Sequence, residues 1–215
     1  MKFNGFELKR EECIVEIGGG DGSLALCLIN KACNIVEFIE PDISAFSLAN
    51  KKLKGKVPTL TRSSIRNINI SKFSKRHKEI TFILQDVIEH IDSDELKNFL
   101  VKLSLKGCKF KMIGRTPNVS SIYGLRNSFG DSTHIHRFTE RTLREYLSKM
   151  GFQITNIKSE PYQVTGLVSA FRMFPYYVVL GLLSLSFICV FGSFEGLFAP
   201  NLVFEALSFK STKSK

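Results

Sequence analysis

The stretch Glu16-Ile17-Gly18-Gly19-Gly20-Asp21-Gly22 decides how the whole chain is interpreted. It follows a β-branched run at 13–17 and precedes an apolar segment at 23–30 that has the pattern of a helix. Glycines let the backbone turn tightly and approach a ligand, and the start of the following helix favours a negative group. A second strand-like run ends at Glu40, where an acid can accept hydrogen bonds from ribose hydroxyls. The pattern predicts a nucleotide-type cofactor site; the alternative is a plain glycine turn, with Glu40 as a solvated strand end.

The rest of the chain alternates strand-like and helix-like segments, which is typical of βαβ units and a mostly parallel sheet. We therefore expect an α/β protein with a single domain over 1–215. Strands are predicted over 13–17, 34–39, 57–61, 80–84, 110–113, 152–157 and 202–209, and helices over 23–30, 43–53, 92–105 and 139–150. The polar stretch from Thr116 to Arg137 is interpreted as a long functional loop.

Composition limits the function classes. The 215 residues are 44% hydrophobic and 23% charged, which excludes a disordered, collagen-like or coiled-coil chain. The net charge of +10 suits a partner that carries phosphates, such as nucleic acid, an anionic bilayer or a phosphorylated small molecule. Five cysteines at scattered spacings favour reduced thiols, and the polar segment 1–12 has no apolar core of a secretory signal. We expect a cytoplasmic protein.

A second motif, Asp86-Val87-Ile88-Glu89-His90-Ile91, follows the fourth predicted strand. An acid and a Glu-His pair at the carboxyl end of a strand lie where open α/β sheets bind ligands. The alternative is an exposed turn that caps the following helix, with His90 at the surface.

The segment from Gly20 to Ala25 also fits the dinucleotide pattern G-x-G-x-x-A, so the glycines alone do not separate a dehydrogenase from other enzymes.

Together these segments resemble class I S-adenosylmethionine-dependent methyltransferases, and D-V-I-E-H resembles the subgroup that acts on small molecules, quinone precursors and sugars. The segments at 114–118 and 131–139 extend the resemblance, which covers about residues 12 to 160. It implies S-adenosyl-L-methionine as the cofactor and a Rossmann-like sheet ordered 3-2-1-4-5-7-6 with strand seven antiparallel. The chain departs from the family after strand three, where Ser63-Ser64 stands in place of the usual Asp. Because strand one is predicted to begin near residue 13, we also expect the N-terminal helices that commonly cover the pocket to be missing.

The resemblance also implies roles for single residues. Glu16 would hold the methionine amino group and Glu40 the ribose hydroxyls. The expected cofactor-binding residues are Glu16, Gly18, Gly19, Gly20, Gly22, Glu40, Pro41, Ser63, Asp86 and Val87.

The histidines His90, His134 and His136 are candidate bases for an oxygen acceptor, because their pKa lies near neutrality. The alternative for each is a structural hydrogen-bonding role. His134 and His136 alternate, so an extended loop would place them on one side. With Asp131 as the only neighbouring ligand the case for a metal ion is weak, and none is expected.

A segment at 173–194 has no charge and is long enough to cross a bilayer. It lies between strands six and seven, which must pair, so we expect a helical insertion over 162–200 that returns as a hairpin. Turns could form at Pro175, Gly181, Gly192 and Pro200. The insertion would hold the protein peripherally at the inner face of the membrane; the alternative is that it covers the protein's own core or a dimer contact.

The expected function is methylation of a small or lipid-linked acceptor, such as a saccharide in bacterial surface-polysaccharide synthesis. A quinone-type lipid is the second acceptor, and a catalytically silent binding module of the same fold is a different class of function. Nucleic acid is disfavoured, because 86–89 does not match the N/D-P-P-Y/F motif, no Pro-Cys occurs, and few aromatics interleave the basic residues. The oligomeric state is left open.

Overall fold

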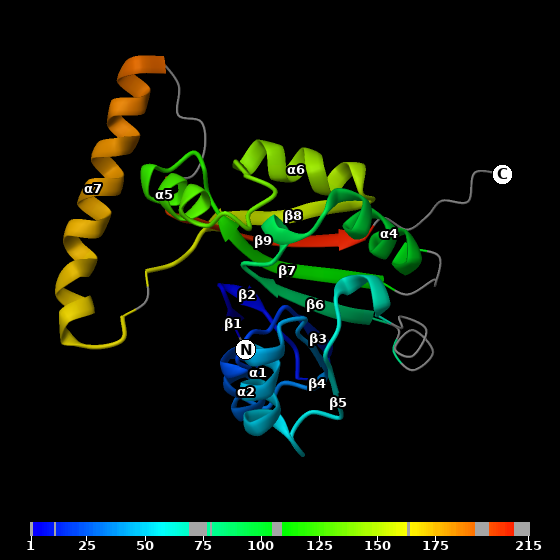
Figure 1. The fold of residues 1–215 in the computed structure, drawn as a ribbon. Coiled ribbons are helices and arrows are strands. Elements are labelled where there is room, and N and C mark those ends of the chain that lie inside the picture. Colours follow the sequence, from blue (N-terminus) through cyan, green and yellow to red (C-terminus); the bar gives the residue numbers. More distant parts are fainter. Residues whose placement is uncertain are drawn as a thin grey trace.

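The computed structural model describes residues 2–10, 12–68, 77, 79–104, 109–162, 164–191 and 198–208. Its centre is a seven-stranded sheet in the order β5-β4-β3-β6-β7-β9-β8, in which β9 runs antiparallel to both neighbours and the other pairs are parallel (Figure 1). The strands are β3 Cys13–Ile17, β4 Ile35–Ile39, β5 Thr59–Thr61, β6 Glu79–Gln85, β7 Lys109–Pro117, β8 Phe152–Ser159 and β9 Asn201–Ser208. Counted from β3 along the chain, this is the predicted order 3-2-1-4-5-7-6.

Helices cover both faces of the sheet. On one face, α4 (Ser93–Ser104) and α6 (Glu140–Lys149) pack against a core that includes Phe82 and Phe110. On the other face, α1 (Ser23–Asn30) and α2 (Ile43–Leu53) pack on a second core that includes Phe38. Strand β3 is buried at every position, as expected of a parallel strand covered on both sides.

Local sequence explains where the helices begin. The Asp42 side chain accepts a hydrogen bond from the Ala45 N–H at 2.8 Å and so caps α2. Thr139 and Thr142 form a capping box at the start of α6. Gly22 caps α1 with a φ of 76°, which a glycine adopts without strain. The sequence predicts α1 and α2 to the residue.

The structure contains elements that the sequence did not indicate. A small hairpin of β1 (Lys2–Phe3) and β2 (Phe6–Glu7) precedes the sheet, and short 3₁₀ helices form at η1 (Ile65–Asn67) and η2 (Ile88–His90). The larger difference is α5 (Ile122–Gly130), which lies inside the stretch predicted to be a loop.

The sequence did not predict α5 because the segment contains glycine, asparagine and serine, which are poor helix formers. Close packing explains one of these residues: a Cβ at Gly124 would lie 2.0 Å from the Asn118 carbonyl oxygen and 2.6 Å from that of Pro200. The helix therefore depends on a tertiary contact rather than on local propensity.

The apolar insertion is one continuous helix, α7 (Leu167–Phe191), so the predicted helical hairpin is wrong. Pro175 and Gly181 lie inside this helix and make no turn, while Gly192 falls outside the described residues. The chain nevertheless returns to the sheet, because Ser159 at the end of β8 pairs with Leu202 near the start of β9.

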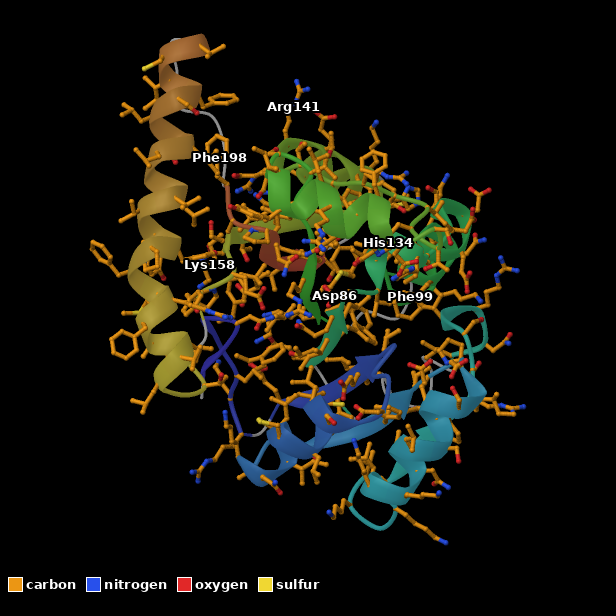
Figure 2. All side chains as sticks on the ribbon, turned by 60° about the vertical axis from the view of Figure 1, so that its left-hand side comes forward. Asp86, Phe99, His134, Arg141, Lys158 and Phe198 are labelled. Atoms are coloured by element: carbon orange, nitrogen blue, oxygen red, sulfur yellow. The ribbon has the colours of Figure 1, made fainter. Side chains whose placement is uncertain are left out.

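Helix α7 is long and apolar enough to cross a bilayer, and none of its apolar stretch is buried. Large side chains along it are open to solvent, among them Phe171 at 82% and Leu182 at 61%. Two aromatic pairs join α7 to flanking segments: Tyr162 with Tyr176, and Phe187 with Phe198. Figure 2 shows Phe198 between α7 and the rest of the domain. The alternative in which the insertion covers the protein's own core is therefore wrong.

Candidate active site

The carboxyl ends of β3, β4 and β6 bring the predicted cofactor segments together. The Gly18 N–H donates to the Ile39 carbonyl at 2.8 Å, which joins the glycine loop to the end of β4. A Cβ at Gly18 would lie 2.5 Å from the Val87 side chain, so the segment after β6 also touches this loop. Motifs that are far apart in the sequence thus share one edge of the sheet.

Different physical reasons explain why glycine occupies each of the predicted positions. Gly18 and Gly19 are required by internal packing, since a Cβ at Gly19 would lie 2.1 Å from the Phe38 ring. Gly20 has a φ of +58° and no atom within 4 Å of the place a Cβ would occupy. Of these three, only Gly20 therefore borders open space that a ligand could use.

Glu16, near the end of β3, is 2% exposed, and its Oε2 is buried with no hydrogen-bond partner in the part of the chain that the structure describes. Burial, followed by the charges of Asp21 and Glu40, raises the pKa of Glu16 to about 8. An unpaired buried carboxyl is costly, and a cationic ligand group would relieve that cost. Glu16 thus fits the role predicted for it toward an amino group.

Glu40 has a structural task as well as its predicted one. Its Oε2 accepts the Gly20 N–H at 2.8 Å and its Oε1 accepts the Asp42 N–H at 2.8 Å. The carboxylate therefore fixes the glycine loop to the start of α2, and each oxygen keeps capacity to accept a hydroxyl donor.

Pro41 and Ser63 lie at the outer end of this edge. Pro41 is exposed beside Glu40, and the Glu40 N–H donates to the Thr61 carbonyl at 3.2 Å, which ties β4 to the end of β5. Ser63 lies two residues past β5, where its hydroxyl donates to the Ser64 carbonyl at 3.0 Å. Both residues therefore lie on the same part of the sheet edge as Glu40.

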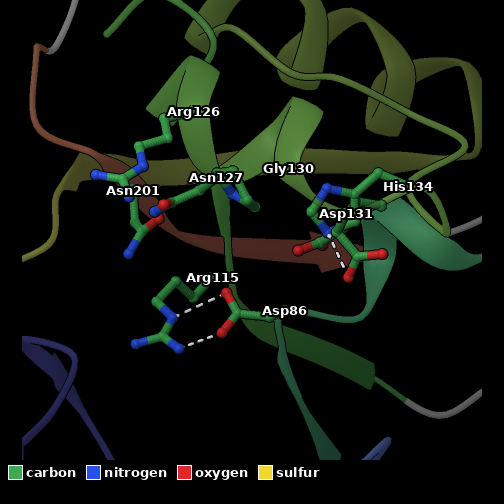
Figure 3. A pocket seen from close by; sticks show the side chains of 10 residues that line it. Asp86, Arg115, Arg126, Asn127, Gly130, Asp131, His134 and Asn201 are labelled. Carbon is green, nitrogen blue, oxygen red and sulfur yellow. Dashed lines mark hydrogen bonds and ion pairs between the residues drawn. The ribbon is translucent and has the colours of Figure 1, made fainter. Parts of the chain in front are cut away.

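Asp86 belongs to an ion-pair network that the sequence did not reveal (Figure 3). Both of its carboxylate oxygens accept hydrogen bonds from Arg115, at the end of β7. Arg115 also donates to Glu160 at 2.7 Å, and Glu160 accepts from the Asn201 amide at 2.7 Å. The network links the ends of β6, β7, β8 and β9. Arg115 lies within the motif at 114–118, which is the one signal in the sequence that could have indicated it.

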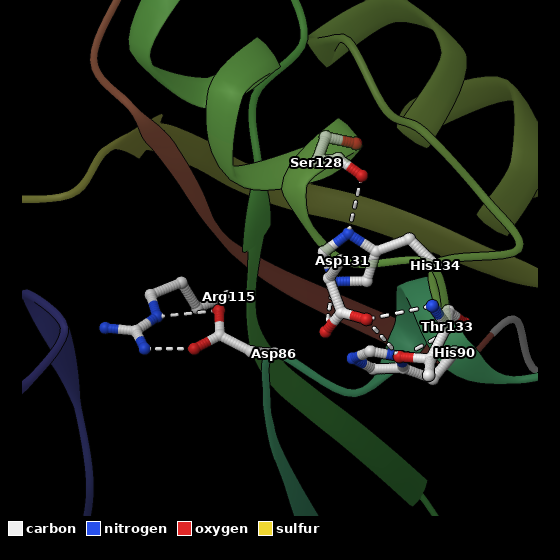
Figure 4. A network of polar contacts seen from close by, with 7 residues as sticks. All are labelled: Asp86, His90, Arg115, Ser128, Asp131, Thr133 and His134. Carbon is white, nitrogen blue, oxygen red and sulfur yellow. Dashed lines mark hydrogen bonds and ion pairs between the residues drawn. The ribbon is translucent and has the colours of Figure 1, made fainter.

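His90 and His134 come together, with ring centroids 4.6 Å apart (Figure 4). The His134 Nδ1 lies 2.9 Å from the Ser128 carbonyl, which only accepts, so Nδ1 carries the proton and Nε2 keeps a free lone pair. The side chain of His134 is 7% exposed, and its Nε2 lies 3.8 Å from Oδ2 of Asp131.

His90 is oriented through Thr133. The Thr133 hydroxyl donates to Asp131 at 2.6 Å, so it acts as an acceptor toward Nδ1 of His90 at 3.0 Å. The Nδ1–H of His90 also lies 3.3 Å from the Thr133 carbonyl. As in His134, the hydrogen bonds place the proton on Nδ1 and leave Nε2 free.

His136 lies elsewhere, so the expectation that it shares a side with His134 is wrong. Its Nε2 lies 3.2 Å from the Ser93 hydroxyl and 3.4 Å from that of Tyr146. Its ring also packs beside Phe138 and Tyr146. The loop is not a regular strand, so alternation in sequence does not fix which way a side chain points. The structure supports the hydrogen-bonding role for His136.

Glu89 is the main site residue absent from the predicted set, although it stood in the quoted motif. It is 1% exposed, and both carboxylate oxygens are buried without a partner in hydrogen-bond geometry among the described residues. The pKa of Glu89 is raised to about 8, chiefly by burial and also by the charge of Asp86, while its own backbone, Thr116 and Arg115 act in the opposite direction. Two unpaired oxygens, with a carboxylate oxygen within 4.8 Å of a ring nitrogen of His90 and of His134, indicate an incomplete site.

A pocket of about 520 Å³ opens between these groups and α5. Its walls are mostly polar and carry both signs of charge, which suits an acceptor with several hydroxyl or phosphate groups. Two of its lining residues are among the predicted site residues: His134 as a candidate base and Asp86 as a cofactor-binding residue. The lining residues are Asp86, Glu89, Arg115, Pro117, Arg126, Asn127, Gly130, Asp131, His134 and Asn201.

No protein-family model matches the chain, and no curated protein matches it in sequence. Many solved structures match the fold. A SAM-dependent methyltransferase from Archaeoglobus fulgidus is 17% identical, over 92% of this chain and 86% of that one, with a TM-score of 0.60. A chain in the complex of the Haloferax volcanii Trm112 methyltransferase activator with a putative methyltransferase is 9% identical, over 94% and 83%, with a TM-score of 0.61.

A third match, magnesium protoporphyrin IX methyltransferase from Synechocystis PCC 6803 with bound SAM, is 14% identical, over 92% of this chain and 70% of that one, with a TM-score of 0.52. Identities this low show a shared fold. The Rossmann-like methyltransferase sheet predicted from the sequence is confirmed.

Proposed function

We propose that this chain transfers a methyl group from S-adenosylmethionine to an oxygen atom of a small or lipid-linked acceptor. The observation that carries the proposal is a pair of adjacent sites on one sheet edge. The first holds the unpaired carboxyl of Glu16 and the open space at Gly20. The second is the polar pocket, and Asp86 belongs to both the predicted cofactor segment and the pocket wall. A donor site beside an acceptor site is what group transfer requires.

When bound, the sulfonium supplies an already activated methyl group, so the protein's main work is positioning. Glu16 would bind the amino group of the donor, and Glu40 would accept hydrogen bonds from its ribose hydroxyls. The loop at Gly18 and Gly19 supports this site through its own packing, while Gly20 offers backbone to the ligand. Pro41, Ser63 and Val87 would flank the donor.

On the acceptor side, the free Nε2 atoms of His90 and His134 are the groups able to interact with an acceptor hydroxyl. His134 lines the pocket directly and is the stronger candidate to assist loss of the hydroxyl proton as the O–CH₃ bond forms. His136, held by Ser93 and Tyr146, takes no part in this proposal.

The short length of the segment between α7 and β9 argues that α7 lies on the membrane without crossing it. If α7 spanned the bilayer, the nine residues from 192 to 200 would have to recross it to begin β9. At about 3.3–3.6 Å per residue, nine residues barely match a hydrocarbon core of about 30 Å even when fully extended. An extended segment would also leave its backbone groups unpaired in lipid. We therefore propose peripheral attachment at the cytoplasmic face.

The attachment would lie close to the pocket. Phe187 of α7 packs on Phe198 with ring centroids 5.2 Å apart. The carbonyl groups of the next two residues, Ala199 and Pro200, accept hydrogen bonds from Asn118, which lies shortly before the start of α5. Because α5 forms one wall of the pocket, an acceptor carried on a lipid could reach it from the membrane face. This favours a lipid-linked saccharide, with a quinone-type lipid as the second choice.

Transfer of labelled methyl from S-adenosylmethionine to a bacterial membrane-lipid extract tests the activity. Label in the chloroform–methanol phase that mild acid releases as a water-soluble sugar supports the saccharide proposal. Acid-stable label in the quinone fraction supports the second acceptor. Calorimetric binding of S-adenosylmethionine without transfer to any fraction would instead support a silent binding module.

Flotation with vesicles that contain phosphatidylglycerol tests the attachment. Leu182→Asp, on α7, should reduce co-flotation by about 10- to 100-fold, the effect of losing a buried leucine from an apolar medium. Ile43→Asp is the matched control, because Ile43 on α2 is 66% exposed and Leu182 is 61% exposed. A wild-type chain that does not float and migrates as a dimer would favour the dimer contact.

A further inference from the structure

Three side chains beside the pocket form a compact cluster of metal-binding types. Glu89, His90 and His134 each bring one potential ligand atom to within 4.8 Å of the other two. The backbone holds the two segments together, because the N–H groups of Ile135 and His136 donate to the Glu89 carbonyl at 2.8 and 3.0 Å. The cluster is therefore fixed by main-chain contacts rather than by mobile surface side chains.

Both histidines are prepared as ligands. The Nδ1 atoms of His90 and His134 are occupied by Thr133 and by the Ser128 carbonyl, so in the neutral ring the proton lies on Nδ1 and Nε2 is the available ligand atom (Figure 4). Histidine ligands in metal sites are typically oriented in this way, with the second nitrogen donating to a carbonyl or another acceptor.

Glu89 provides an independent observation. It is 1% exposed, and neither carboxylate oxygen has a partner in hydrogen-bond geometry among the described residues. The guanidinium of Arg115, which lines the same pocket, pairs with Asp86 and Glu160 instead. A buried carboxylate without a counter-charge is strongly disfavoured, and a bound cation would supply that charge.

We propose that Glu89, His90 and His134 bind one divalent transition-metal ion whose open coordination positions face the pocket. Two imidazole nitrogens and one carboxylate suit ions such as Mn²⁺, Fe²⁺ or Zn²⁺. Oδ2 of Asp131, 3.8 Å from Nε2 of His134, is close enough to contribute a further oxygen after a small movement. The sequence favoured no metal because it suggested only His134 with His136; the fold instead pairs His134 with a Glu-His dipeptide that lies 44 residues earlier.

Binding of the ion does not depend on the proposed methyl transfer, whereas a catalytic role rests on it. An acceptor hydroxyl bound to the ion would lose its proton to solvent water more readily, because a cation lowers the pKa of a bound oxygen. The oxygen would then form its bond to the methyl carbon as the bond from that carbon to sulfur breaks. In that case the histidines act as ligands and not as the base.

The direct test is titration of the EDTA-treated full chain with MnCl₂, with free Mn²⁺ followed by electron paramagnetic resonance. We expect one ion per chain. Glu89→Gln and His134→Gln should each weaken binding by at least about tenfold, the scale seen when metal sites lose a supporting group. His136→Gln is the matched control from the same loop and should bind as the wild type does.

Thermal unfolding gives a second readout that separates lost binding from lost folding. Mn²⁺ should raise the Tm of the wild type and of His136→Gln and leave that of Glu89→Gln unchanged. Equal Mn²⁺ binding by all four proteins, or no binding by a folded wild type, would overturn the proposal. Calorimetry with S-adenosylmethionine on the same samples reports separately on the donor site, so failure of one proposal is distinguishable from failure of the other.

Discussion

Glu16 and Glu89 are two buried glutamates on the same edge of the sheet, and comparing them separates the two halves of the site. Among the described residues, one carboxylate oxygen of Glu16 and both of Glu89 are buried without a hydrogen-bond partner, and burial is the main reason that the pKa of each is raised to about 8. Their neighbours differ. Glu16 lies near Asp21 and Glu40 beside a glycine loop, whereas Glu89 faces two histidines. The first environment suits an organic cation and the second suits a metal ion or a reacting hydroxyl. Two carboxyl groups with a similar cost of burial therefore suit different ligands, because their neighbours differ.

The comparison predicts that substitutions on the acceptor half change turnover and leave donor binding intact. His134→Ala should lower methyl transfer by about 10²–10⁴-fold, the usual reach of a group that assists proton transfer. The affinity for S-adenosylmethionine should stay within about twofold, because His134 lines the pocket and not the glycine loop. Initial rates with a labelled donor and calorimetry on the same sample provide both measurements.

His136→Ala is the control for that prediction, since its side chain packs on Tyr146 away from the pocket. It should keep near-wild-type turnover and lose some stability. If His136→Ala lowers turnover as much as His134→Ala does at equal folded fraction, the division between the two histidines is wrong.

On the donor half, Gly20→Val should reduce S-adenosylmethionine binding by about 100-fold or more, because the new side chain would enter the only open space found in the loop from Gly18 to Gly20. Gly55→Val is a matched control: Gly55 has a φ of +77° and also no atom within 4 Å of a Cβ. Both variants should lose about 1–2 kcal/mol of stability through left-handed backbone strain. Equal loss of binding in both would show that strain, and not ligand space, explains the effect at Gly20.

Gly18 further tests the distinction between glycines needed for packing and glycines that face a ligand. A side chain there would collide with Val87, so Gly18 variants should fail through misfolding rather than through a blocked site. The sequence could place both glycines in one motif, yet it could not tell the packing glycine from the ligand-facing one.

The sequence predicted the strands and helices around the proposed donor half because its signals there are local. Strand β3, the glycine loop, α1 and Glu40 lie within one continuous segment, and turn chemistry there is set by neighbouring residues. The acceptor half is built from long-range contacts. Arg115 pairs with Asp86 across 29 positions and with Glu160 across 45 positions, and Glu160 pairs with Asn201 across 41. No spacing rule relates such residues, so only the fold brings them together.

Elements held by tertiary contacts escaped prediction for a related reason. Helix α5 contains Gly124, whose hydrogen atom faces the Asn118 and Pro200 carbonyls, and this contact outweighs poor helix propensity. Helix α7 differs in the opposite direction: the sequence predicts turns at Pro175 and Gly181, but the long apolar run forms one helix that continues through both residues.

A smaller effect distinguishes the two glutamates in binding. Glu16→Gln should weaken S-adenosylmethionine binding by about 1–3 kcal/mol, since it removes a charged partner of the amino group. Glu89→Gln should leave that affinity unchanged, because Glu89 lines the acceptor pocket. Isothermal titration of both variants against the wild type measures the difference. A loss of affinity in Glu89→Gln comparable with that in Glu16→Gln would merge the two sites into one.

The last prediction concerns stability and not binding: it is the pH dependence that Glu16 produces. Its pKa is about 8 in the folded chain and 4.5 as the ordinary value, so between these values the folded state binds more protons than the unfolded state. Stability must then fall as pH rises from about 4.5 to 8, with a slope of at most about 1.4 kcal/mol per pH unit from this group. Glu16→Gln removes the titrating proton and should flatten the slope measured by urea unfolding at a series of pH values. Saturating S-adenosylmethionine should flatten it as well, because the bound amino group would keep Glu16 ionised throughout. A slope that Glu16→Gln leaves unchanged would show that Glu16 already has a counter-charge in the free protein, and its environment would then no longer match that of Glu89.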